Sequence, residues 1–152
     1  MEIIEYTNEY LSELEPMLVG IQDFEKELNE ERESGTKVVK RWINEYHPEN
    51  NLEKVYLGKD NGQIVGFIWI TYSNDLMNKP TYIYLHISDL FIKKEYRGMG
   101  YGKEFLKFCE KLGREKKVKG LSLTVLKKNV NAYEVYKKYG FEDLDITMYK
   151  RL

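Results

Sequence analysis

The chain has 152 residues, of which 42% are hydrophobic and 32% charged, so it can bury a core in one domain, residues 1–152. Its only cysteine, Cys109, excludes an internal disulfide, and no Cys/His cluster has zinc spacing. The longest apolar run, 64–70, is far short of the roughly 20 residues that cross a bilayer, and the acidic amino terminus lacks a signal-peptide pattern, so we expect a cytoplasmic protein without a metal.

The net charge of −1 hides two oppositely charged halves. Residues 1–76 hold 7 basic and 16 acidic side chains, a charge of −9, and residues 77–152 hold 17 and 9, a charge of +8. A basic half is consistent with binding a polyphosphate, and an acidic half would attract a cation. The acidic set could equally be a solvated helix face; it consists of Asp23, Glu25, Glu27, Glu30, Glu31 and Glu33.

The first 50 residues predict one strand and two helical segments. Residues 2–6 favour a short strand, and Thr7 or Asn8 is placed to cap a helix. That helix contains Leu11, Leu14 and Leu18. A second helical stretch has apolar residues from Phe24 to Tyr46, and we expect it to break at Ser34-Gly35. It should end at His47, because the residue before a proline is disfavoured in a helix.

The middle of the chain predicts three strands. Residues 54–58 and 63–72 form an expected hairpin, because Asn61-Gly62 supplies the positive φ angles of a tight turn. After a loop at 73–80, residues 81–92 predict a long strand of aromatic and β-branched residues.

Three glycines at alternate positions follow that strand, in the stretch Arg97-Gly98-Met99-Gly100-Tyr101-Gly102-Lys103. Alternating glycines before a helix let several backbone N–H groups point outward together, and the helix dipole favours an anion at the same place. The P-loop is excluded because Gly102-Lys103 is followed by Glu104 and not by serine or threonine. The dinucleotide fingerprint Gly-x-Gly-x-x-Gly is excluded because its third glycine is missing. The pattern that remains is Arg-x-x-Gly-x-Gly.

The rest of the chain predicts a helix to about Lys117, a strand at 121–126, a helix at 130–139 and two terminal strands within 141–151. Cys109 lies on the apolar face of the first of these helices, so we expect a packing residue and not a nucleophile.

Two segments together resemble a known family. The strand and glycine turn resemble the acyl-CoA-binding motif of GNAT N-acetyltransferases, and residues 129–141 resemble the family's Asn-x-x-Ala-x-x-x-Tyr-x-x-x-Gly-Phe segment. The resemblance implies an α/β (α+β) GNAT fold, a mixed and mostly antiparallel sheet of about seven strands flanked by about four helices. It covers 55–152 well, whereas the first 50 residues, which shape the acceptor site in this family, match only in element order. Lys94 stands where the family often has proline.

The resemblance implies acetyl-CoA as cosubstrate and a primary amine of a small molecule or peptide as acceptor, joined in a direct ternary complex; a homodimer is also in keeping with it. The backbone at 97–102 and Lys103 would hold the diphosphate. The backbone of Leu90, Phe91 and Ile92 would pair with the pantetheine arm. Asn129 and Asn131 match positions near the cofactor, and Asn129 is also a candidate helix cap.

Three residues are candidates for proton transfer. Tyr136 matches the family's tyrosine whose hydroxyl faces the CoA sulfur, and a phenol can donate a proton to a departing thiolate. His86 stands where one branch of the family has a catalytic glutamate, and Asp89 is its rival as base. Strand alternation puts these two on opposite faces unless a bulge intervenes. Alternatively, His86 has a purely structural role, or a water chain removes the proton from the amine.

Two other functions compete with an acetyltransferase. One is an acyl-CoA-binding sensor or structural domain without turnover, against which Tyr136 argues. The other is nucleic-acid binding, which the absence of a basic-aromatic motif disfavours.

Overall fold

The computed structural model describes residues 1–46, 52–74, 83–148 and 150, and within this part the chain forms one five-stranded sheet with helices on both faces. The strands are β1 (Glu2–Glu5), β2 (Glu53–Asp60), β3 (Gln63–Asn74), β4 (Ile83–Ile92) and β5 (Gly120–Leu123). The α-helices are α1 (Leu11–Leu28), α2 (Gly35–Glu45), α3 (Tyr101–Glu115) and α4 (Val130–Tyr139), and two short 3-10 helices are η1 (Asn8–Tyr10) and η2 (Lys94–Tyr96).

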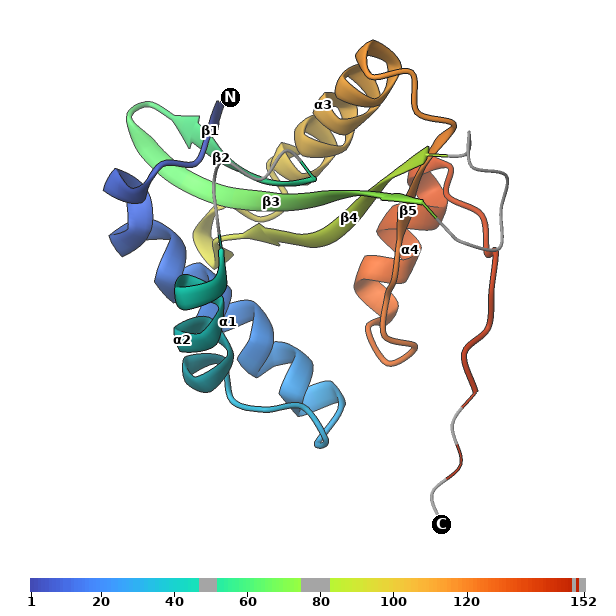
Figure 1. The fold of residues 1–152 in the computed structure, drawn as a ribbon, viewed down its shortest axis with the longest axis horizontal. Coiled ribbons are helices and arrows are strands. Elements are labelled where there is room, and N and C mark those ends of the chain that lie inside the picture. Colours follow the sequence, from blue (N-terminus) through green and yellow to red (C-terminus); the bar gives the residue numbers. More distant parts are fainter. Residues whose placement is uncertain (47–51, 75–82, 149, 151–152) are drawn as a thin grey trace.

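The sheet follows the order β1-β2-β3-β4-β5, antiparallel except for the parallel pair β4 and β5. Helices α1 and α2 cover one face and α3 covers the other (Figure 1). The core is therefore split in two by the sheet. Phe67 of β3 is buried on the α1 side, and Ile68 beside it is buried against Phe105 of α3, as strand alternation requires.

The predicted hairpin is confirmed. Asn61 and Gly62 have φ angles of 46° and 82°, and Asp60 pairs with Gln63 across them. Positive φ at both central residues defines the turn that matches strand twist. This hairpin sets the edge of the sheet against which β1 pairs.

The amino-terminal helices are divided differently from the prediction. Phe24 and Leu28 belong to α1, which is one helix of 18 residues, and the break falls at residues 29–34. The capping prediction is wrong, because the Thr7 hydroxyl bonds to Glu9 and α1 begins only after η1, with Tyr10 at its N-cap. The predicted end at His47 lies outside the described residues.

The expectation of about seven strands is wrong for the described part of the chain. Residues 141–148 form no strand, and Leu144, Ile146 and Met148 are 82%, 87% and 90% exposed. β5 is also shorter than predicted, since Thr124 to Leu126 leave the sheet. The class of fold, a mixed and mostly antiparallel sheet with four α-helices, is nonetheless the predicted one.

Cys109 is fully buried in the layer between the sheet and α3. Burial raises the pKa of its thiol to about 12, which keeps it protonated and unreactive at neutral pH. The prediction of a packing residue is confirmed.

Candidate active site

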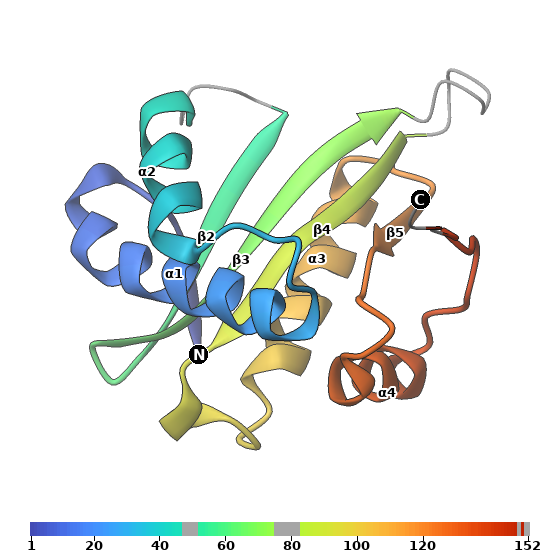
Figure 2. The ribbon, with the colours of Figure 1, turned by 90° about the horizontal axis from the view of Figure 1, so that it is seen from below.

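The site begins where β4 and β5 separate. The two strands pair from Tyr84 with Gly120 as far as Ile87 with Leu123, and β4 then continues to Ile92 paired with β3 only. From below the sheet, β5 is the shorter strand at its edge, with α4 after it in the chain (Figure 2). Backbone groups of β4 beyond Ile87 therefore face an edge that β5 no longer covers.

Hydrogen-bond alternation identifies these groups. The Lys93 N–H donates to the Val65 carbonyl of β3, at 2.9 Å, so Phe91 and Lys93 direct their backbone groups to β3. Leu90 and Ile92 direct theirs to the opposite edge. The Arg97 Nε donates to the Ile92 carbonyl from that side, at 3.0 Å, which agrees with this assignment. The exposed edge of β4 can pair with an extended ligand as an added strand would.

A bulge in β4 places the two candidate bases on one face. Trp69 pairs with Asp89 and Ile70 with Ile87, so Ser88 is the extra residue. Before the bulge, Ile87 packs on the α3 side, and after it Leu90 does. His86 and Asp89 consequently both face the α1 side. The sequence allowed His86 and Asp89 to share a face only if a bulge lay between them, and the structure has that bulge.

The surroundings of His86 and Asp89 differ. His86 Nδ1 lies 3.0 Å from Ser122 Oγ, within the paired part of β4 and β5, and burial lowers its pKa. Asp89 lies past that pairing. Burial, together with the nearby Glu25 carboxylate and against the opposing charge of Arg32, raises the pKa of Asp89 to about 6. A carboxyl with this pKa can accept a proton near neutral pH.

Tyr136 shares the electrostatic environment of Asp89. Burial raises its pKa, and the carboxylates of Asp89 and Glu25 add to the effect, so its phenol is protonated at neutral pH. Its ring packs edge-on against Phe141, at 5.8 Å between centroids. Among the described residues its hydroxyl has no hydrogen-bond partner, unlike that of Tyr133, which donates to Asp143 at 2.9 Å. Tyr136 is therefore an available proton donor near a carboxylate.

The glycine turn is open on its outer side. Gly98 and Gly100 have φ angles of 79° and 91°, which side chains disfavour, whereas Gly102 has no such requirement. A methyl group at any of the three would meet nothing within 4 Å. Since Gly102 lies in the first turn of α3, where alanine is a better helix former, its missing side chain leaves room for something outside the protein.

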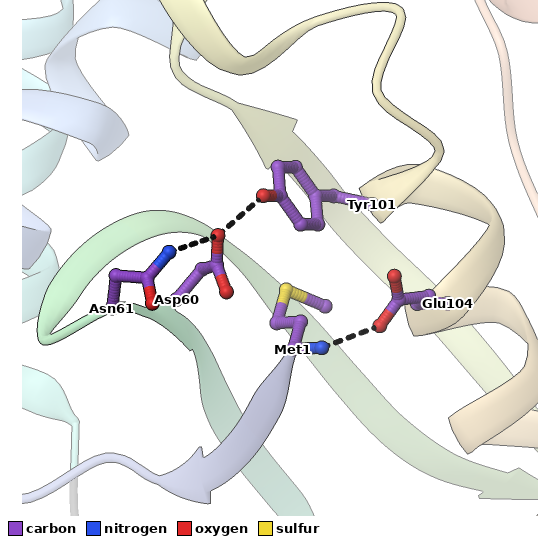
Figure 3. Close-up of polar contacts among 5 residues, drawn as sticks. All are labelled: Met1, Asp60, Asn61, Tyr101 and Glu104. Atoms are coloured by element: carbon purple, nitrogen blue, oxygen red, sulfur yellow. Dashed lines mark hydrogen bonds and ion pairs between the residues drawn. The ribbon is translucent and has the colours of Figure 1, made fainter.

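Two side-chain contacts fix the start of α3 next to this turn (Figure 3). The Tyr101 hydroxyl donates to Asp60 Oδ2 at 2.7 Å, and the amino group of Met1 lies 3.1 Å from Glu104 Oε2. Because the Tyr101 side chain is turned inward and 8% exposed, only its backbone N–H can serve an anion. The first-turn N–H groups of α3 have no partner within the helix and point to the glycine turn.

The remaining predicted residues occupy the periphery. Asn129 caps α4, its side chain accepting from the Ala132 N–H at 3.3 Å, and Asn131 is exposed in the first turn of the same helix. Met99 and Lys103 are exposed at the turn. Sequence reasoning named Glu25 only as one of six acidic residues that could attract a cation or form a solvated helix face, and did not place it near Asp89. Its spacing of seven residues from buried Leu18 was the signal that it lies on the inner face of α1.

Among the described residues, no group of three or more His, Cys, Asp and Glu side chains is arranged to hold a metal ion. In the same part of the chain, no helix combines the length and apolarity needed to cross a membrane.

The separated strands β4 and β5, the glycine turn at the start of α3, and Tyr136 with Asp89 make up the candidate site. The model of the acetyltransferase (GNAT) family matches residues 17–141, and the chain belongs to this family.

Relatives cover part of the chain. It is 33% identical over 89 residues to an uncharacterized N-acetyltransferase, YycN, of Bacillus subtilis, and 33% over 86 residues to a probable spermine N(1)-acetyltransferase of Bacillus subtilis subsp. natto. It is 35% identical over 60 residues to the thialysine N-epsilon-acetyltransferase of Bos taurus. These matches cover 59%, 53% and 40% of this chain, and 54%, 54% and 35% of the relatives, so the chain spans about half of their length or less.

Solved structures show the same fold over nearly the whole chain. A mutant form of the BH1408 protein from Bacillus halodurans matches with a TM-score of 0.86 at 21% identity, covering 100% of this chain and 99% of that one. An aminoglycoside N-acetyltransferase in complex with CoA matches with a TM-score of 0.72 at 14% identity, covering 99% and 98%.

Proposed function

We propose that this protein transfers an acetyl group from acetyl-CoA to a primary amine of a small molecule or peptide, in a complex that holds both substrates and forms no covalent enzyme intermediate. The observation that carries the proposal is the separation of β4 from β5, with a glycine turn at one end of the exposed edge and Tyr136 and Asp89 beside it. Relatives named for spermine and thialysine favour a cationic amine as acceptor.

The residues present fit acetyl-CoA. The N–H groups at the start of α3 and the space beside Gly98, Gly100 and Gly102 suit a diphosphate, with exposed Lys103 adding charge. The backbone groups of Leu90 and Ile92 suit an extended arm. Acetyl-CoA supplies an activated thioester, and an N–H on this edge of β4 is a donor for its carbonyl.

Proton transfer then divides between two residues. Asp89, with its pKa of about 6, takes the proton that the acceptor ammonium must lose before nitrogen can attack. The Tyr136 hydroxyl gives a proton to the departing thiolate. We assign the base to Asp89 in preference to His86, because His86 is engaged with Ser122 and lies within the paired strands.

A panel of primary amines incubated with acetyl-CoA and a thiol reagent tests the proposal. Release of CoA that depends on an added amine, with the acetylated amine found by mass spectrometry, is the expected result. Tight acetyl-CoA binding without CoA release across the panel would favour the sensor alternative. Absence of acetyl-CoA binding would refute both.

A further inference from the structure

Helix α1 crosses the exposed part of β4 in the opposite direction. Near the start of α1, Glu13 forms an ion pair with Lys93 at 3.0 Å. Further along, Gly20 lies over Phe91, whose ring would be 3.6 Å from a methyl group at that position. Extending this alignment by five residues of helix and two of strand brings Glu25 over Asp89. The influence of Glu25 on the pKa of Asp89 agrees with that placement.

Glu25 interrupts the apolar stripe of α1. Leu14 and Leu18 are buried on the inner face, and Glu25 continues their spacing at the point where an apolar residue would follow. Its side chain is 22% exposed, so it is a partly buried carboxylate facing the site and not a solvated one. Such a group needs a cation beside it.

Arg32 supplies that cation in this structure. Its Nη1 lies 2.7 Å from Glu25 Oε2, and its side chain is 39% exposed. Arg32 belongs to the segment between α1 and α2, which is fixed at its far end by the Gly35 N–H donating to Asp23 at 2.7 Å. Because the Arg32 side of this pair is open to water, the guanidinium is held less firmly than in a fully buried ion pair. Arg32 can therefore be displaced without loss of the fold.

A cleft opens at the end of α1, beyond Glu25. It has a volume of about 380 Å³ and lies between the end of α1 and the segment leading into α4, and it is lined by Glu27, Leu28, Asn29, Glu30, Leu126, Lys127 and Lys128. The α1 wall of the cleft carries Glu27 and Glu30, and the opposite wall carries Lys127 and Lys128. The acidic wall begins two residues beyond Glu25 on the same helix.

We propose that Glu25 binds a second cationic group of the acceptor, and that Arg32 occupies the Glu25 carboxylate until the acceptor displaces it. The inference rests on the proposed function and narrows its acceptors to amines with a second positive charge, such as short diamines and polyamines. One nitrogen reacts beside Asp89 while the other is held by Glu25.

Two acceptors of equal chain length isolate the second charge: 1,4-diaminobutane, which has it, and butylamine, which lacks it. We expect Glu25→Gln to lower the ratio of kcat/KM for the diamine to that for butylamine at least tenfold. Arg32→Gln should raise the same ratio about threefold or more, since the competing cation is gone. Glu15→Gln, the same change on an exposed position of α1, should leave the ratio within twofold of the wild type.

An unchanged ratio in Glu25→Gln, or a fall in Arg32→Gln, would overturn the inference. If Glu25→Gln proves unfolded by circular dichroism, Glu25→Asp, which keeps the charge, should retain diamine preference, and loss of that preference would count against it. Should the wild type acetylate neither these two amines nor any other amine of the panel, the proposed function fails by itself. Calorimetric binding of 1,4-diaminobutane still decides the role of Glu25: weaker binding to Glu25→Gln supports it, and equal or no binding refutes it.

Discussion

At the scale of single residues, the fold disfavours the ionised form of the Asp89 side chain. A carboxylate in a partly buried strand position, close to a second carboxylate, has its folded-state pKa raised from 3.8 to about 6. The folded protein therefore binds the Asp89 proton more tightly than the unfolded chain does. This group favours folding below about pH 4, and that contribution is lost as the pH rises through 6.

Replacement of Asp89 by asparagine should stabilise the protein and inactivate it. At pH 7 the charged form of Asp89 opposes folding, so removing it should raise the free energy of unfolding by about 1–3 kcal/mol in urea denaturation. At pH 4 the gain should nearly vanish. A loss of stability at pH 7 would show that Asp89 has a compensating partner.

The pH dependence of the wild-type reaction should report the same group. With Asp89 as base, kcat/KM for the amine should rise with pH through about 6, and Asp89→Asn should lower it by about 100-fold or more and abolish that step. His86→Asn provides the comparison. If that variant, and not Asp89→Asn, removes the acidic limb, the base is His86.

Tyr136 should act only in the reaction and not in binding. Its hydroxyl has no hydrogen-bond partner among the described residues, so Tyr136→Phe should leave the melting temperature and the Kd of acetyl-CoA nearly unchanged and lower kcat about 100-fold. The matched control is Tyr133→Phe, on the same helix as Tyr136, which loses an exposed hydrogen bond to Asp143. If Tyr136→Phe has the same kcat as the wild type, the thiolate takes its proton from water and not from Tyr136.

At the scale of elements, the three glycines of the glycine turn have two different roles: two set the backbone conformation, and the third leaves space for a ligand. Gly98 and Gly100 hold backbone angles that other residues reach only with strain, whereas Gly102 lies in regular helix. Gly98 and Gly100 therefore set the shape of the turn, and Gly102 leaves space beside it.

Alanine at Gly102 should raise stability and weaken cofactor binding. Helix propensity predicts a gain of about 0.5–1 kcal/mol, since a methyl group there meets no protein atom within 4 Å. The same methyl group should raise the Kd of acetyl-CoA tenfold or more by obstructing the diphosphate. Gly98→Ala should lower stability instead. If Gly102→Ala binds acetyl-CoA as the wild type does, the diphosphate lies elsewhere.

The elements that the sequence predicted well are those with local signals. The hairpin at Asn61-Gly62 and the helices after the glycine turn and after Asn129 follow from turn and cap residues. The bulge at Ser88 has no such signal, because it depends on pairing with β3. The alternation of Leu144, Ile146 and Met148 is a local strand signal, but a strand needs a partner, and the described structure gives these residues none.

At the scale of the molecule, the two oppositely charged halves of the chain meet at the site. Glu25 comes from the acidic half, on the α1 face of the sheet, and the glycine turn and α4 come from the basic half (Figure 1). The cationic acceptor and the anionic cosubstrate that we propose would therefore each be attracted by a different part of the surface.

Both substrates should consequently bind more weakly as salt is added. Between 20 and 300 mM NaCl the Debye length falls from roughly 20 Å to roughly 6 Å, so the KM values for 1,4-diaminobutane and acetyl-CoA should each rise several-fold while kcat stays nearly constant. The KM of butylamine should rise less, because it has one charge and not two. A diamine KM that is independent of salt would mean that the acidic half is only a solvated surface, and that the acceptor is selected by shape alone.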